Sequence, residues 1–73
     1  MKLQIVSGDE FVKRAKKVGF VFEKQEGSHM ILRLSHHPFT KLSVPRHKEL
    51  GKGLLRRLLR DADIIVQEFI KLK

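Results

Sequence analysis

Cysteine, tryptophan and tyrosine are all missing from this chain of 73 residues. Without cysteine the protein can form neither a disulfide bond nor a thiolate-ligated metal site, so its hydrophobic core has to stabilise the fold nearly unaided. A cysteine-free chain suits a reducing compartment, and we expect a cytoplasmic protein. Without tryptophan or tyrosine, only Phe39 or the plane of an arginine is expected to stack on a nucleobase.

Long apolar runs are also missing. No stretch approaches the roughly 20 residues needed to cross a bilayer, and residues 1–6 are too short and polar for the apolar part of a signal peptide. We therefore expect no membrane partner. With 41% hydrophobic residues, the chain of 73 residues is predicted to form one domain over residues 1–73, near the lower size limit for a self-sufficient core.

Acidic residues are few, since 8 Asp and Glu stand against 16 Lys and Arg and the formal charge is +8. On so small a body this charge favours a polyanionic partner over a surface that is merely basic and solvated. The densest basic segment, residues 46–60, has Glu49 as its single acidic residue. It is either a phosphate-binding surface or the solvated face of an amphipathic helix.

The spacing of apolar residues predicts a helix, three antiparallel strands and a second helix, followed by a short C-terminal helix. Ser7 and Glu10 form a capping-box pattern that begins the first helix, and Gly19 is expected to end it. Asp63 is a candidate N-cap of the last helix. The strands and the second helix are expected at 20–25, 29–35, 41–44 and 53–62. Helices on one face of such a sheet make a two-layer α+β fold.

The alternation of side chains along a strand predicts where His29 lies. Met30, Leu32 and Leu34 form an apolar face that the helices would cover. His29 therefore falls on the uncovered face, near Arg33, Lys41 and Ser43. In the preceding strand the same alternation puts Phe20, Phe22 and Lys24 on one side and Val21, Glu23 and Gln25 on the other.

The usual motifs of metal, nucleotide and triad chemistry do not occur. The four histidines, His29, His36, His37 and His47, lack the spacing of a known metal site, so neither a metal nor another cofactor is expected. Gly51-Lys52-Gly53 matches no phosphate-binding loop, and Ser28 beside His29 does not make a nucleophile and base.

What remains is a histidine on a basic surface, which suits RNA cleavage. RNA carries its own nucleophile, the 2′-hydroxyl, so an enzyme needs to bind the backbone and move protons. Imidazole does this near neutral pH, and neighbouring cations stabilise the charge on the phosphorane. A non-catalytic RNA-binding module and a protein that only docks an acidic partner remain open as alternatives.

Short motifs spread along almost the whole chain resemble those of a known protein family. They are Ser7-Gly8, Val18-Gly19-Phe20, Gly27-Ser28-His29, Val44-Pro45 with His47, and Gly53-Leu54-Leu55-Arg56. In this order they resemble the HicA family of toxins from bacterial and archaeal toxin–antitoxin modules. The resemblance implies a fold like the double-stranded-RNA-binding domain, a metal-independent endoribonuclease that cuts mRNA, and a HicB-type antitoxin as protein partner.

The resemblance also assigns roles to residues. It implies that His29 is catalytic, that Gly27 allows the tight turn and that Ser28 orients the loop or touches phosphate. His47 is expected to support catalysis, as an RNA contact, a second proton-transfer group or a helix cap. Leu54 departs from the family, whose members commonly carry Thr there. The candidates for phosphate binding are Lys24, Arg33, Lys41, Arg46, Lys48, Lys52 and Arg56.

Overall fold

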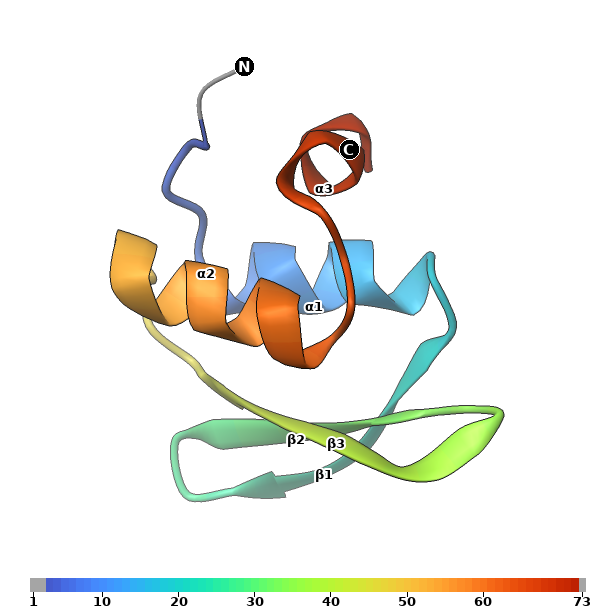
Figure 1. Cartoon of the computed structure of the whole chain (residues 1–73). Helices are drawn as coiled ribbons and strands as arrows, with labels where there is room; N and C mark the ends of the chain where they lie inside the picture. The colour runs from blue at the N-terminus through green and yellow to red at the C-terminus, as the bar shows by residue number, and fades with distance from the viewer. Residues whose placement is uncertain (1–2, 73) are drawn as a thin grey trace.

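The chain folds into a three-stranded sheet covered by helices on one face (Figure 1). The computed structural model describes residues 3–72, and the predicted α+β order is confirmed. The elements are α1 (Gly8–Lys16), β1 (Phe20–Glu26), β2 (His29–Leu34), β3 (His37–Pro45), α2 (Lys52–Asp61) and α3 (Val66–Lys71). The strands are antiparallel in the order β1-β2-β3, as expected of consecutive strands joined by short turns. No helix within residues 3–72 is long and apolar enough to cross a membrane.

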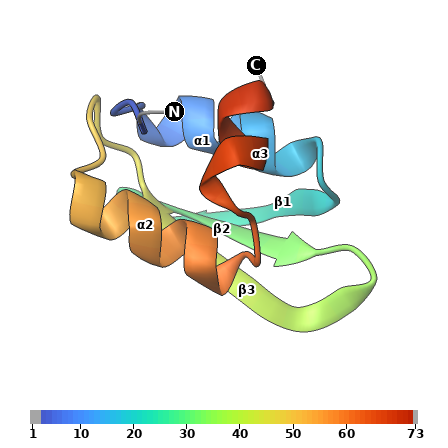
Figure 2. The ribbon, with the colours of Figure 1, turned by 45° about the horizontal axis from the view of Figure 1, so that its top comes forward.

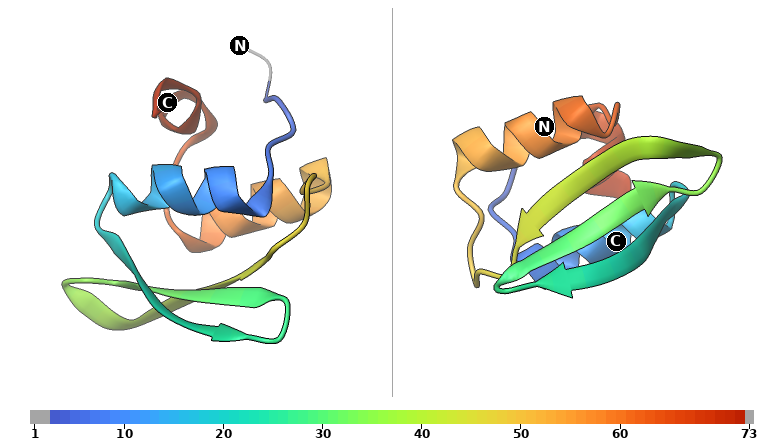
Figure 3. Two further views of the ribbon diagram at one scale, coloured as in Figure 1. Left: turned by 180° about the vertical axis from the view of Figure 1, so that it is seen from behind. Right: turned by 90° about the horizontal axis from the view of Figure 1, so that it is seen from below.

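The core lies between the sheet and the helices, and the other face of the sheet is left open (Figure 3). Alternate strand residues point into this core, as the period of two requires. Its fully buried side chains include Phe11 of α1, Leu32 of β2, Val44 of β3 and Leu55 of α2. Viewed from the open face, α2 extends past the β3 edge of the sheet (Figure 3).

The first helix begins as its capping pattern predicts. The amide of Glu10 donates to Ser7 Oγ at 3.0 Å. The Glu10 carboxylate does not complete the predicted box, because it accepts from Arg14 Nε at 2.7 Å. Arg14 also donates to the Phe69 carbonyl at 3.3 Å and lies 4.7 Å above that ring, which ties α1 to α3.

The predicted ends of two helices need correction. α1 ends at Lys16 with Lys17 as its cap, so Gly19 lies beyond the cap and supplies the positive φ of 104° that turns the chain into β1. Asp63 is not an N-cap, since α3 begins at Val66 after Ile65. It lies instead in the turn between α2 and α3 with a φ of 58°, a conformation that Asp tolerates better than most residues.

A β-bulge in β1 corrects the predicted faces of that strand. The register shifts between Phe22 and Lys24, so that Lys24 pairs with Ile31 and Gln25 with Met30. One extra residue in a strand reverses the side-chain alternation beyond it. Lys24 therefore lies on the open face, and Gln25 lies on the face that the helices cover.

The third strand is longer than predicted. It begins at His37, four residues before the expected start, and His37 pairs with Leu34 after a register shift. The residues that the sequence assigns to a loop thus belong to the second hairpin.

Candidate nucleic-acid interface

His29 lies at the start of β2, directly after the turn at Gly27 and Ser28. Gly27 has a φ of 58°, which favours glycine in this tight turn. The imidazole is exposed on the open face, where alternation predicts it, and its Nδ1 lies within hydrogen-bonding distance of Ser43 Oγ, at 3.0 Å. Because Ser43 holds Nδ1, Nε2 is the ring nitrogen that remains for another molecule.

His29 lines a groove between β3 and α2, which lie side by side in Figures 1 and 2. We call it the His29 groove. It encloses about 380 Å³, and its walls include His29, Lys41, Ser43, Pro45, Leu54 and Arg57. An imidazole, a hydroxyl and two cations thus converge on one hollow, together with the carboxylate of Asp61.

The cations of the open face are largely ion-paired. Lys41 Nζ lies 3.2 Å from Glu23 Oε2, and Arg33 Nε lies 3.8 Å from Glu23 Oε1. Lys24 Nζ lies 2.7 Å from Glu26 Oε1, and this hydrogen bond raises the pKa of Lys24 and lowers the pKa of Glu26. These pairs reduce the positive field beside His29 below what the sequence alone suggests.

Arg57 is a groove residue that the sequence reasoning missed. Residues of an α-helix spaced by three or four share a face, so Arg57 lies with Leu54 and the neighbouring Asp61, whereas Arg56 turns away. Arg57 forms no ion pair within residues 3–72. The spacing from Leu54 is the signal that distinguishes the two arginines.

Leu54 packs partly against the core while it lines the His29 groove. No side chain caps the start of α2, and no acidic residue lies in its first turn. The Thr that the resemblance leads us to expect at this position is thus replaced by an apolar contact rather than by another hydroxyl.

The remaining predicted residues lie outside the His29 groove. Arg46 sits beyond the end of β3, where its amide donates to the Ser28 carbonyl at 2.7 Å and its Nε lies 3.4 Å from Asp9 Oδ1. His47 and Lys48 occupy the exposed loop before α2, and the His47 carbonyl accepts from the Gly8 amide at 2.9 Å. Lys52 and Arg56 are exposed on α2.

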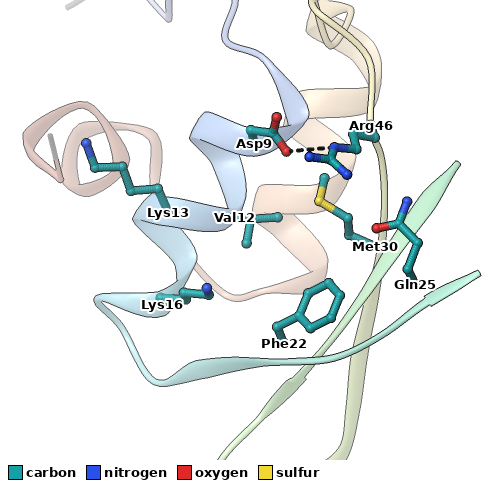
Figure 4. A pocket seen from close by; sticks show the side chains of 8 residues that line it. All are labelled: Asp9, Val12, Lys13, Lys16, Phe22, Gln25, Met30 and Arg46. Atoms are coloured by element: carbon teal, nitrogen blue, oxygen red, sulfur yellow. Dashed lines mark ion pairs between the residues drawn. The ribbon is translucent and has the colours of Figure 1, made fainter.

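A second groove lies between α1 and β1 (Figure 4). We call it the Phe22 groove. It encloses about 440 Å³ and is lined by Val12, Lys13, Lys16, Phe22, Gln25 and Met30, with Asp9 and Arg46 at one end. Phe22 is 45% exposed, so Phe39 is not the only accessible aromatic ring, contrary to the sequence-based expectation.

No group of three His, Cys, Asp or Glu side chains within residues 3–72 could hold a metal ion. The rings of His36 and His37 lie 5.0 Å apart at the far end of the sheet from His29. Around His29 the structure therefore assembles donors and cations, without the set of ligands that a metal centre requires.

Comparison with known proteins identifies the family. Residues 8–64 match the family described as the HicA toxin of bacterial toxin–antitoxin, a match that begins with α1 and ends just beyond α2. No curated protein matches the chain significantly. The family match includes His29 and the walls of both grooves and extends over most of the sequence, so the chain belongs to the HicA toxin family, whose members are known as mRNA interferases.

Proposed function

We propose that this toxin is a metal-independent endoribonuclease that cuts mRNA in the cytoplasm, with His29 as its proton-transfer group. The observation that carries the proposal is an exposed imidazole that is oriented by Ser43 and faces a groove with Lys41 and Arg57. The family's association with RNA and with an antitoxin supports it.

The hydrogen bond between His29 and Ser43 supports a role in proton transfer. When Nδ1 carries its hydrogen and donates to Ser43 Oγ, Nε2 presents a lone pair to the groove. His29 then takes the proton of a ribose 2′-hydroxyl as that oxygen bonds to the adjacent phosphorus. The bond from phosphorus to the 5′-oxygen breaks, and that oxygen takes up a proton from the solvent, so the products are a 2′,3′-cyclic phosphate and a 5′-hydroxyl.

The cations of the His29 groove supply the second part of the mechanism. Lys41 and Arg57 stabilise the negative charge that develops on the phosphorane oxygens. Proton transfer by one positioned group contributes about 10²–10⁴-fold. A site with one imidazole and exposed cations is therefore expected to give a slow ribonuclease.

The other predicted residues are proposed to support RNA binding. Gly27 allows the turn that presents His29, and Ser28, whose carbonyl is bound by the Arg46 amide, touches phosphate at that turn. His47 lies outside the His29 groove, which favours contact with the RNA backbone over proton transfer. Backbone contacts are proposed for Lys24, Arg33, Arg46, Lys48, Lys52 and Arg56.

The protein partner is proposed to be a HicB-type antitoxin that covers the His29 groove. A rival function is a non-catalytic RNA-binding module, which the formal charge of +8 and the exposed cations of α2 favour independently of His29. The two functions differ in one respect only, which is whether bound RNA is cut.

The test compares wild type with His29→Ala and with His37→Ala, an exposed histidine at the opposite end of β2 and β3. Purified proteins are incubated with single-stranded RNA in EDTA, and growth is followed after induced expression. We expect His29→Ala to lose growth arrest and about 10²–10⁴-fold in cleavage rate while still binding RNA. His37→Ala should behave as wild type. Equal arrest by both variants would show that catalysis by His29 is wrong, and binding by wild type without cleavage would favour the rival.

A further inference from the structure

The Phe22 groove combines features that suit a nucleobase. Its walls are partly apolar, with the buried Val12 and Met30 near a half-exposed Phe22 ring (Figure 4). Bases stack on such aromatic faces irrespective of sequence. Contiguous exposed apolar surface beside polar groups commonly marks a binding site.

The charges around the groove favour an anionic chain. Lys13 and Lys16 lie on α1 along one wall, and neither forms an ion pair within residues 3–72. The acidic residue of the groove, Asp9, is paired with Arg46 at 3.4 Å. The groove therefore offers Lys16 near an aromatic ring, while the Lys13 ammonium points away from that ring (Figure 4). A cation near an aromatic ring is the combination that binds single-stranded nucleic acid.

Gln25 adds a group that can distinguish one base from another. The β-bulge at Glu23 places it on the same face as Met30, inside the groove. Its Nε2 donates to the Gly27 carbonyl at 3.0 Å, which orients the carboxamide. The amide still has a second N–H and its oxygen, a donor and an acceptor that match the edge of a base.

The groove and His29 belong to the same end of the first hairpin. Gln25 pairs with Met30 and Glu26 pairs with His29, so neighbouring residues of β2 face the two grooves from opposite sides of the sheet. Arg46 lies at the rim of the Phe22 groove and is hydrogen-bonded through its amide to the turn residue Ser28. An RNA strand bound at His29 can thus pass round the turn at residues 27–28 and reach the Phe22 groove.

We propose that the Phe22 groove is a nucleobase subsite of the RNA substrate, in which Phe22 stacks on a base near the cut and Gln25 reads its edge. The proposal rests on the proposed function in that the ligand is RNA. It adds a determinant of base preference on the face of the sheet opposite to His29.

Binding measurements in a His29→Ala background test this subsite without cleavage of the ligand. The probes are single-stranded RNA homopolymers of U, A and C and a chain of the same length without bases. Phe22→Leu keeps the groove apolar and is expected to weaken binding about 10-fold, as loss of one stacked base does. Phe22→Tyr keeps a ring and should restore affinity. Phe39 is the ring that the sequence offers for stacking, but it lines neither groove. Phe39→Leu, at a ring that is 98% exposed, is therefore the matched control for the Phe22 groove and should change little.

Gln25→Leu tests the reading of the base edge. We expect it to reduce the difference in affinity among the homopolymers while the thermal unfolding curve stays that of the background protein. The subsite is disproved if Phe22→Leu binds as Phe39→Leu does, or if the base-free chain binds as well as the homopolymers. It is also disproved if Phe22→Leu loses only neutralisation by the antitoxin, which would make the groove a protein-docking surface.

The outcome is separable from that of the proposed function. If wild type fails to cut RNA while Phe22→Leu still weakens RNA binding, the catalytic proposal fails and the subsite stands. If wild type cuts RNA and Phe22→Leu binds RNA normally, the subsite proposal fails and the catalytic proposal stands.

Discussion

The His29 groove and the Phe22 groove both carry cations, but the cations are engaged differently. In the His29 groove Lys41 shares Glu23 with Arg33, whereas Arg57 forms no ion pair within residues 3–72, and an imidazole is present to move a proton. In the Phe22 groove Lys13 and Lys16 form no ion pair within the described residues, and an aromatic ring takes the place of the imidazole. A formal charge of +8 thus does not produce a uniform positive field, because acidic side chains on the open face reduce the field next to His29.

Substitution of Gly8 is expected to lower stability the most, because Gly8 packs against Pro45 and Arg46, which line the two grooves. A Cβ at this position would clash with the Pro45 carbonyl oxygen, and Pro45 lines one groove while the following Arg46 lines the other. We expect Gly8→Ala to lower the free energy of unfolding by about 3 kcal/mol, the upper end of the usual cost of overpacking. RNA binding and cleavage should fall together.

Gly51→Ala is the control for that prediction. A Cβ added at Gly51 meets nothing within 4 Å, so the loss of stability should stay below about 1 kcal/mol, the usual cost of Ala at a helix N-cap. Denaturant unfolding measures both variants. Equal stability of Gly8→Ala and Gly51→Ala would show that the contact between α1 and β3 is not tight.

Substitution of Arg57 tests whether this cation of the His29 groove contributes to catalysis. Arg57→Ala is expected to slow cleavage about 10- to 100-fold, less than the roughly 10²–10³-fold for a buried oxyanion donor, because Arg57 is exposed. Arg56→Ala, on the adjacent position of α2, should affect binding more than rate. Single-turnover cleavage separates the two quantities, and a larger rate loss for Arg56→Ala would contradict the assigned helix face.

Lys16 tests the contrast between unpaired and paired cations. Lys16→Ala should weaken RNA binding a few-fold and reduce the salt slope by about 0.7 per lost contact with single-stranded RNA. Arg33→Ala removes a cation that faces Glu23 at 3.8 Å and should change the slope less. Titrations at several salt concentrations give both slopes, and a reversed order would refute the contrast.

Controls aside, substitution of Glu10 is expected to change stability the least and to leave RNA binding unchanged. Glu10 lines neither groove, and its partner Arg14 contacts Phe69 of α3. Its hydrogen bond with Arg14 lowers its pKa below the ordinary 4.5. The pair therefore stabilises the fold fully above that value, and its contribution is lost as the pH falls through the lowered pKa. Glu10→Gln should cost about 0.3–0.5 kcal/mol at pH 7, and the difference from wild type should shrink in acid.

Glu49→Gln is the control for this pH series. Glu49 is exposed and forms no ion pair within the described chain, so the substitution should lower the free energy of unfolding at pH 7 by less than Glu10→Gln does. A difference between Glu10→Gln and wild type that persists unchanged in acid would exclude the Arg14 pair as its source.

Much of the fold follows from local signals in the sequence. Ser7 predicts the start of α1, and the apolar alternation of Met30 and Leu32 places His29 on the open face because a slip by one residue would expose the core. The bulge at Glu23 escapes prediction, since the polar residues around it carry no apolar pattern that distinguishes one face from the other. The extension of β3 to His37 also depends on pairing with β2 rather than on its own residues.

The candidate site is less accessible to sequence reasoning than the fold. His29 is recognisable from its turn and its motif, but the spacing from Leu54 selects Arg57 over Arg56 only once Leu54 is known to lie on the face of α2 beside β3. The ion pairs of Glu23 join different strands, so their effect on the charge around His29 appears only in three dimensions. The exposure of Phe22 likewise depends on how far α1 covers β1.

Cleavage of an RNA with a single 2′-deoxynucleotide at a mapped cut site, in EDTA, tests the catalytic account most directly. If His29 transfers a proton for the ribose hydroxyl, wild type binds this RNA normally but leaves that position intact, and it cuts the all-ribose RNA to a 2′,3′-cyclic phosphate and a 5′-hydroxyl. Cutting at the deoxy position, or ends that carry a 3′-hydroxyl and a 5′-phosphate, would contradict the account.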